Sequence, residues 1–213
     1  PPVEAAAVNI PPVADAGKKY KVDEGAKVKL DGTASIDPDG EIVAYEWTRK
    51  KRLNDPTKAR PRFEGIDDDK VQIELTVTDD DGAEHTASAS IRILNVDPSL
   101  EALPDRDAVT GVRLVVDDIR FTDAGVKDTH TVSVDWGDGT KTRPEISEEK
   151  GSGSAIAAHA YADPGEFTVV VTVADDDGGK TARKFVVSVK RPDPAPITRS
   201  AADDSTDGSP PGQ

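Results

Sequence analysis

The sequence predicts an all-β chain built from two tandem β-sandwiches. An alternating apolar strand that runs into Asp-Asp-Asp-Gly occurs twice, at residues 75–82 and 171–178, which indicates two copies of one module. Val, Thr and Ile recur with period two, as expected for short antiparallel strands. Aromatic residues make up only 4% of the 213 residues, and this composition suits two thin cores better than one large core.

Each module carries period-two apolar sets that define its expected core faces. In the first module these sets are Val28 and Leu30; Val43, Tyr45 and Trp47; Val71, Ile73, Leu75 and Val77; and Ala87, Ala89, Ile91 and Ile93. In the second module they are Val112, Leu114 and Val116; Val132, Val134 and Trp136; Phe167, Val169, Val171 and Val173; and Phe185, Val187 and Val189. Trp47 and Trp136 each end such a face, so core packing is favoured over ligand stacking for both.

Proline-bearing junctions separate the modules. Residues 9–12 (Asn-Ile-Pro-Pro) are matched in type by residues 95–98 (Asn-Val-Asp-Pro), and subtracting 9 from 95 gives an offset of 86 residues. Proline fixes φ and stiffens such a link. The expected organisation is a linker or arm at 1–8, a first domain at 9–95, a second domain at 96–191, and a tail rich in Pro, Asp and Ser at 192–213.

The charge balance excludes some classes of partner. The formal charge is −14 and the sequence pI is about 4.6, so the basic face that a nucleic-acid binder needs is missing. The one basic cluster, at residues 49–52 and continued by Lys58, Arg60 and Arg62, is either a solvated loop or a patch that docks an acidic neighbour. No apolar run approaches the roughly 20 residues of a membrane helix, so membrane insertion is not expected.

The chain contains no cysteine. It therefore has no disulfide, no thiolate that could bind zinc and no cysteine nucleophile. A secreted protein without disulfides needs rigidity from another source, and bound cations are one such source. The sequence begins at Pro1 and contains no methionine, so we expect a processed or excised fragment.

The second module carries the most specific motifs. Residues 135–140 read Asp-Trp-Gly-Asp-Gly-Thr, residues 159–169 read His-Ala-Tyr-Ala-Asp-Pro-Gly-Glu-Phe-Thr-Val, and residues 173–179 read Val-Ala-Asp-Asp-Asp-Gly-Gly. These segments are similar to the hallmarks of the polycystic kidney disease (PKD) domain family, which are Trp-x-Phe-Gly-Asp-Gly and His-x-Tyr followed by Pro-Gly-x-Tyr-x-Val. The resemblance implies an immunoglobulin-like β-sandwich.

The first module resembles the same family more loosely. The similar segments are residues 12–17, 30–40 and 45–47. Residues 48–50 read Thr-Arg-Lys where the Gly-Asp-Gly turn is expected, so a longer loop should follow Trp47. Together the two resemblances cover about residues 9–190.

Oxygen-rich loops form the strongest candidate site. Calcium takes 6–8 oxygen ligands from carboxylates, carbonyls and water, and some PKD-like modules bind calcium where the linker meets one end of the sandwich. The resemblance therefore implies Ca²⁺. The candidate ligands are Asn9, Asp37, Asp39, Asp79 and Asp81 in the first module and Asn95, Asp123, Asp128, Asp175 and Asp177 in the second. The alternative is that these aspartates form Asx-turns and keep the surface soluble; the EF-hand pattern is absent.

Catalytic patterns are weak. His159 belongs to the PKD-like signature and should make a structural hydrogen bond, whereas His85 and His130 are expected to be exposed. The sequence has no nucleophile elbow, zinc-protease motif or phosphate loop. A sandwich with short loops also offers little cleft for a pair of catalytic carboxylates. We therefore expect no enzymatic activity.

The leading functional expectation is structural. It is a calcium-stiffened extracellular or cell-surface spacer, or a fibre or filament subunit. Its partners would be other domains of the same protein or identical subunits, the latter through strand addition by the apolar arm at residues 3–8. Two alternatives stay open: an accessory module of a secreted hydrolase that binds polysaccharide or a protein such as collagen, and a cell-adhesion module.

Overall fold

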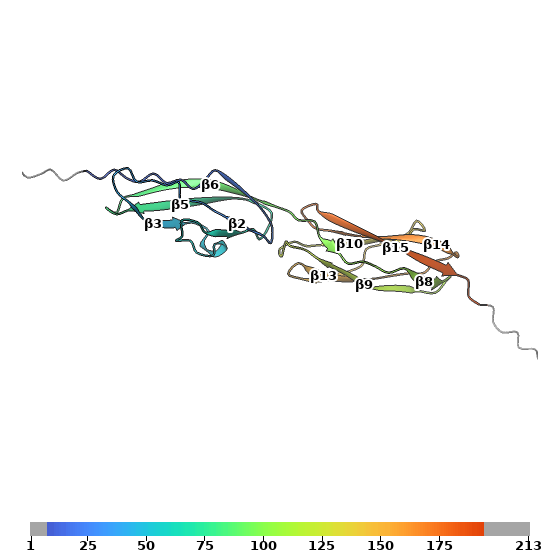
Figure 1. Cartoon of the computed structure of the whole chain (residues 1–213). Helices are drawn as coiled ribbons and strands as arrows, with labels where there is room; N and C mark the ends of the chain where they lie inside the picture. Colours follow the sequence, from blue (N-terminus) through green and yellow to red (C-terminus); the bar gives the residue numbers. More distant parts are fainter. Residues whose placement is uncertain (1–7, 194–213) are drawn as a thin grey trace, which may run out of the picture.

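The computed structural model describes residues 8–193 as two β-sandwiches arranged end to end (Figure 1). Long strands run along each sandwich, and β6 leads from the first module directly into the second. The all-β prediction is confirmed, because the only helix within residues 8–193 is a 3-10 turn, η1 (Lys50–Arg52). This part of the chain has no helix long and apolar enough to cross a membrane.

The first module consists of a four-stranded sheet in the order β1-β6-β5-β3 and a two-stranded sheet of β2 and β4. β1 runs parallel to β6, and the other neighbours are antiparallel. The strands are β1 (Lys19–Asp23), β2 (Lys27–Lys29), β3 (Ile42–Trp47), β4 (Arg62–Glu64), β5 (Lys70–Asp79) and β6 (Glu84–Leu94).

The second module has a five-stranded sheet in the order β11-β10-β14-β15-β8 and a four-stranded sheet in the order β12-β13-β9-β7. β8 runs parallel to β15, just as β1 runs parallel to β6. The strands are β7 (Ser99–Leu100), β8 (Arg106–Val109), β9 (Leu114–Thr122), β10 (Thr131–Asp135), β11 (Lys141–Thr142), β12 (Ile146–Glu149), β13 (Ser152–His159), β14 (Gly165–Ala174) and β15 (Lys180–Lys190).

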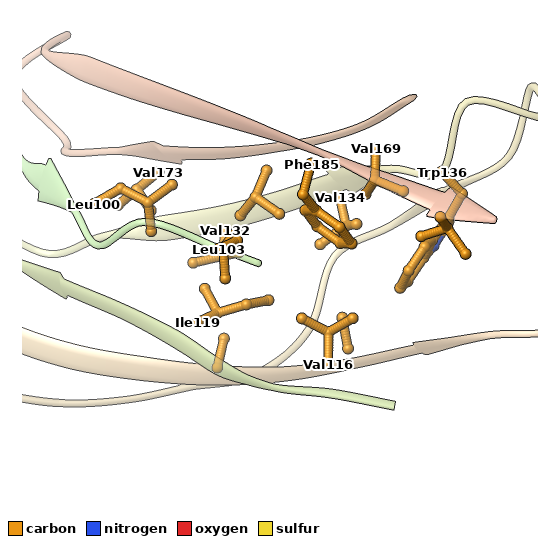
Figure 2. Close-up of a cluster of buried hydrophobic side chains, with 14 of the residues drawn as sticks. Leu100, Leu103, Val116, Ile119, Val132, Val134, Trp136, Val169, Val173 and Phe185 are labelled. Atoms are coloured by element: carbon orange, nitrogen blue, oxygen red, sulfur yellow. The ribbon is translucent and has the colours of Figure 1, made fainter. Parts of the chain in front are cut away.

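Each module has its own apolar core. In the first, Trp47 is fully buried and its indole N–H donates to the carbonyl oxygen of Lys58 at 3.0 Å. In the second, Trp136 is fully buried and lies among the valine and phenylalanine side chains of both sheets (Figure 2). The Trp136 indole N–H donates to the Thr142 hydroxyl at 2.8 Å. Core packing, predicted for both tryptophans, is confirmed.

Two strand faces differ from the prediction. A register shift between Ile42 and Ala44 puts a β-bulge into β3, and a bulge reverses the side to which the following residue points. Val43 is therefore 62% exposed, while Ile42 packs against the core. Val112 lies before β9 begins and is 56% exposed. Placing Val43 and Val112 on core faces was wrong.

The basic cluster forms the longer loop expected after Trp47. Residues 50–52 make up η1, Lys50 pairs with Glu46, and Arg60 pairs with Asp31 at 3.1 Å. The four side chains of these pairs are between 49% and 63% exposed, so the cluster fits a solvated loop. The predicted arm at 1–8 and tail at 192–213 lie almost wholly outside the described residues.

The bulge in β3 leads to a stability prediction for two valines. Val77→Ala, at a fully buried position, should lower the free energy of unfolding by about 2 kcal/mol because two methyl groups leave the core. Val43→Ala should change it by less than about 0.5 kcal/mol. Urea unfolding followed by the amide NMR signals of the first module measures both. Equal losses at the two positions would contradict the bulge.

Candidate metal centre

Both linkers are fastened to the following sandwich in the same way. The Asn95 amide nitrogen donates to Asp175 at 3.0 Å, and the Asn9 amide nitrogen donates to Asp79 at 3.0 Å. The second carboxylate oxygen of Asp175 accepts the backbone N–H of Gly179 at 2.7 Å. In the first module Asp79 accepts the N–H of Ala83 at the same distance. The first aspartate of each Asp-Asp-Asp-Gly turn therefore closes its own turn and also holds the preceding linker.

Five carboxylates from both modules meet where the modules join. One oxygen from each of Glu24, Asp123 and Asp128 lies within 4.8 Å of the others, and the same holds for Asp67, Asp128 and Asp177. Asp128 belongs to both groups. We call these five residues the joint cluster. Glu24 follows β1 and Asp67 precedes β5 in the first module, whereas the other three lie in loops of the second.

Glu24 and Asp128 are the buried members of the joint cluster, and three of their four carboxylate oxygens have no hydrogen-bond partner. Glu24 is 2% exposed and Asp128 is 9% exposed. Oε1 of Glu24 accepts the backbone N–H of Val96 at 2.6 Å, but its Oε2 has no partner, and neither has any oxygen of Asp128. Oδ1 of Asn95 is also unpartnered. Buried polar atoms almost always have a partner, so these oxygens are available to bind a cation or a water molecule.

Electrostatics point the same way. Burial raises the pKa of Glu24 to about 7, and the nearby carboxylates of Asp128, Asp123 and Asp68 add to the shift. Burial also raises the pKa of Asp128 to about 6, again with help from neighbouring aspartates. Within residues 8–193 no lysine or arginine forms an ion pair with any member of the joint cluster. The repulsion is not offset by a lysine or arginine ion pair in this part of the chain, and the basic side chain in contact with the cluster is His130, which lies 3.0 Å from Asp123.

His130 holds one wall of the cluster in place. Its side chain is fully buried, with Nε2 at 3.0 Å from Asp123 and Nδ1 at 2.9 Å from Glu148. Burial lowers the pKa of His130, but the hydrogen bonds with Asp123 and Glu148 outweigh it and raise the pKa above its ordinary value. The prediction that His130 is exposed was wrong, because it lies in the loop before β10 and points inward between two carboxylates.

The donor set of the joint cluster fits a hard divalent cation. Its ligands are all carboxylate oxygens, which suit calcium, magnesium and manganese better than zinc or copper. The carboxylates come from four separate loops, and calcium tolerates such irregular geometry while magnesium demands a near-ideal octahedron. The residues present therefore fit Ca²⁺.

The candidates of the first module are not gathered in this way. Asp39 accepts the backbone N–H of Ile10 at 3.1 Å, and Asp37 keeps one buried oxygen unpartnered. Within the described residues no three carboxylates of this end form a group like the joint cluster. Asp81 is exposed, and Asp80 instead reaches the loop, where it accepts the N–H of Glu41 at 2.9 Å.

Sequence reasoning missed Glu24 and Asp67, the two members from the first module. Asp67 begins a third run of aspartates, residues 67–69, which has no counterpart in the second module. Glu24 precedes a glycine with φ of +70°, a turn that the sequence marks only weakly. The runs of like charge at residues 67–69 and 175–177 were the available signal.

His159 has the structural role expected of it. Its Nε2 lies 2.6 Å from Asp138, and its ring stacks on Trp136 with centroids 5.0 Å apart. Asp138 sits between Gly137 and Gly139, whose φ values of +81° and +92° suit the tight turn. The indole and the imidazole are thereby tied to the hairpin that follows β10.

Family models match both modules. The model described as "PKD domain" matches residues 95–189, and the model described as "K319L-like, PKD domain" matches residues 16–93. The chain belongs to the PKD domain family. It carries two PKD domains in tandem, as the sequence predicted. PKD domains are typically non-catalytic modules and are commonly extracellular.

Solved structures similar to this chain include single PKD domains and immunoglobulin-like arrays. The PKD1 domain of Epp from Vibrio anguillarum is 28% identical, over 40% of this chain and 96% of that chain, with a TM-score of 0.33. The PKD domain of an M14-like peptidase from a Thermoplasmatales archaeon is 19% identical, over 45% and 98%, with a TM-score of 0.35. An I-band fragment of titin is 15% identical, over 87% and 68%, with a TM-score of 0.40.

The position of His130 in the second PKD domain leads to a prediction. His130→Phe keeps a ring in the core but removes the hydrogen bonds to Asp123 and Glu148, so the second domain should lose about 1–3 kcal/mol of unfolding free energy. Glu148→Gln, which keeps an acceptor and is 29% exposed at its side chain, should lose less. Urea unfolding followed by the amide NMR signals of the second domain compares them. If His130→Phe leaves the unfolding free energy of the second domain unchanged, the structural role of His130 is contradicted.

Proposed function

We propose that this pair of PKD domains is a non-catalytic extracellular spacer of a surface or secreted protein, stiffened by calcium. The observation that carries the proposal lies in the second domain's part of the joint cluster, where both oxygens of the buried Asp128 have no partner. In the second domain the calcium ligands are Asp123, Asp128 and Asp177, with Asn95 as a further oxygen donor from the linker. Asp175 fastens that linker to the turn.

Calcium supplies what this fold lacks. The chain has no cysteine, so no disulfide restrains the two domains relative to each other. A cation at the joint cluster neutralises carboxylates that otherwise repel one another. Its binding free energy adds to the folded state because the unfolded chain cannot gather these loops. A string of domains joined in this way holds its ends apart, which is the property that a spacer needs.

The end-to-end arrangement supports a spacer over a binding module. The two domains extend one after the other (Figure 1), and each has a separate core. An accessory module that binds polysaccharide or collagen would be expected to present an exposed aromatic strip. All nine Phe, Tyr and Trp side chains lie within residues 8–193, and each is buried or half-buried. No feature of the described residues favours the adhesion alternative.

The proposal predicts that calcium reverses the order of stability of Asp128→Asn and the unchanged chain. In a chelator, Asp128→Asn should be at least as stable, because the substitution removes an unpartnered buried charge. With calcium at a hundred times its dissociation constant, the unchanged chain should gain about 2.7 kcal/mol, and the variant should gain little. Thermal and urea unfolding with and without calcium measure both. Glu149→Gln, at an 81% exposed side chain, is the matched control.

A second test concerns length. Small-angle X-ray scattering of the full chain should give a maximum dimension that is sharply defined with calcium and broadened by a chelator, because the joint then flexes. Glu149→Gln should behave as the unchanged chain does. If neither unfolding nor scattering responds to millimolar calcium, the level at which weak extracellular sites fill (on the order of 10⁻⁴ to 10⁻³ M), the proposed function is wrong.

A further inference from the structure

We infer that the calcium site of the second domain is completed by the first domain, so that one ion binds across the joint through Glu24. This inference rests on the proposed calcium site and deepens it. The ion would be held by Glu24 from one domain and by Asp123 and Asp128 from the other, with Asp67 and Asp177 at the exposed rim. The two domains would then share an ion, where the spacer proposal alone requires only that the second domain holds one.

The first observation is geometric. Oxygens of Glu24, Asp123 and Asp128 lie within 4.8 Å of one another, although Glu24 is 99 residues from Asp123 in sequence (123 − 24). The second triad repeats the pattern, because Asp67 of the first domain meets Asp128 and Asp177 of the second. Each triad therefore contains one carboxylate from the first domain and Asp128.

The second observation is independent of charge. Glu24 is only 2% exposed. Its Oε1 accepts the backbone N–H of Val96, whereas its Oε2 has no hydrogen-bond partner. A glutamate oriented by one oxygen and left free at the other is positioned to give that oxygen to a ligand. Leaving such an oxygen buried without a partner costs about 1–3 kcal/mol, which a shared cation would offset.

The turn that carries Glu24 lies close to the second domain because the next residue is a glycine. Gly25 has φ of +70°, and a Cβ placed on it would lie 3.1 Å from the carbonyl oxygen of Ala124 in the second domain. A side chain here would crowd Ala124 of the second domain. The glycine therefore serves both the left-handed turn and the seating of Glu24 against the loop that holds Asp123 and Asp128.

The second domain has no equivalent of Glu24 at its own far end. The backbone N–H of Glu24 donates to Leu94 at 3.0 Å, and the N–H of Thr110 donates to Lys190 at the same distance. Gly111 has φ of +74°, matching Gly25. Thr110 therefore occupies the place of Glu24 in the same turn. The shared site is a property of this joint and not of every PKD turn.

This equivalence supplies the test variants. Glu24→Gln keeps an acceptor for the N–H of Val96 but removes the charge, and Glu24→Thr installs the residue that the same turn carries in the second domain. Both should fold, since Thr110 shows that the turn accepts threonine. Asp128→Asn is the variant that disables the second domain's own part of the site. Glu149→Gln again removes one exposed charge without touching the joint.

The experiment measures calcium binding to the full chain by isothermal titration calorimetry. Because calcium affinity follows the number of charged ligands, Glu24→Gln and Glu24→Thr should each weaken the joint site by about tenfold or more. Glu149→Gln should leave it unchanged. As a second readout, residual dipolar couplings of the calcium-loaded chain should give one alignment tensor for both domains, and two different tensors once Glu24 is replaced.

The outcomes separate the two proposals. If Glu24→Gln and Glu24→Thr bind calcium as the unchanged chain does while Asp128→Asn loses binding, the ion belongs to the second domain alone and this inference is overturned. The spacer proposal then stands. If Asp128→Asn also binds as the unchanged chain does, both are wrong. Loss of affinity in both Glu24 variants, together with independent tensors, supports the shared ion.

Discussion

The like charges that lie close together where the two domains meet are the main constraint on this structure. Five carboxylates converge from four loops. Within residues 8–193 no lysine or arginine pairs with them, and His130 pairs with Asp123 alone among the five. An isolated buried carboxylate shifts its pKa or finds a partner. The raised pKa values of Glu24 and Asp128 represent the first response, and the divalent cation that we propose would represent the second.

The fold explains why the charges meet there. In each domain the linker is fastened by an asparagine to the first aspartate of the Asp-Asp-Asp-Gly turn. β6 passes straight into this fastening, which leaves the β1–β2 turn of the first domain facing the loops of the second. A short, pinned linker limits the relative motion of the domains. The two domains can still move relative to each other at the contact between Glu24 and the loop of Asp128. An ion bound at this contact would restrict that motion most.

Much of the fold could be predicted from sequence. Period-two patterns identified the buried faces of β5, β6, β10, β14 and β15, and both tryptophans lie in the cores as expected. The bulge at Val43 could not be predicted from the sequence. One inserted residue changes the face of the sheet on which side chains lie without changing the alternating apolar pattern. His130 was misplaced for a related reason: a polar residue in a loop gives no periodic signal, and its burial depends on two carboxylates distant in sequence.

The candidate site was predictable only within one domain. Asp123, Asp128 and Asp177 belong to loops that the PKD resemblance implies. Asp39, Asp79 and Asp175 instead bind backbone groups or linkers, a role that composition cannot distinguish from metal binding. Glu24 and Asp67 depend on how two domains abut, and that contact leaves no local pattern in the sequence.

The most direct measurement is a crystal structure of the full chain grown with millimolar calcium, with anomalous scattering used to locate the ion. The account predicts an anomalous peak between Glu24 and Asp128, with oxygens of both domains at 2.3–2.6 Å, the usual range for calcium. A joint whose carboxylates hold only water, or a peak bound by the second domain with Glu24 turned away, would contradict it.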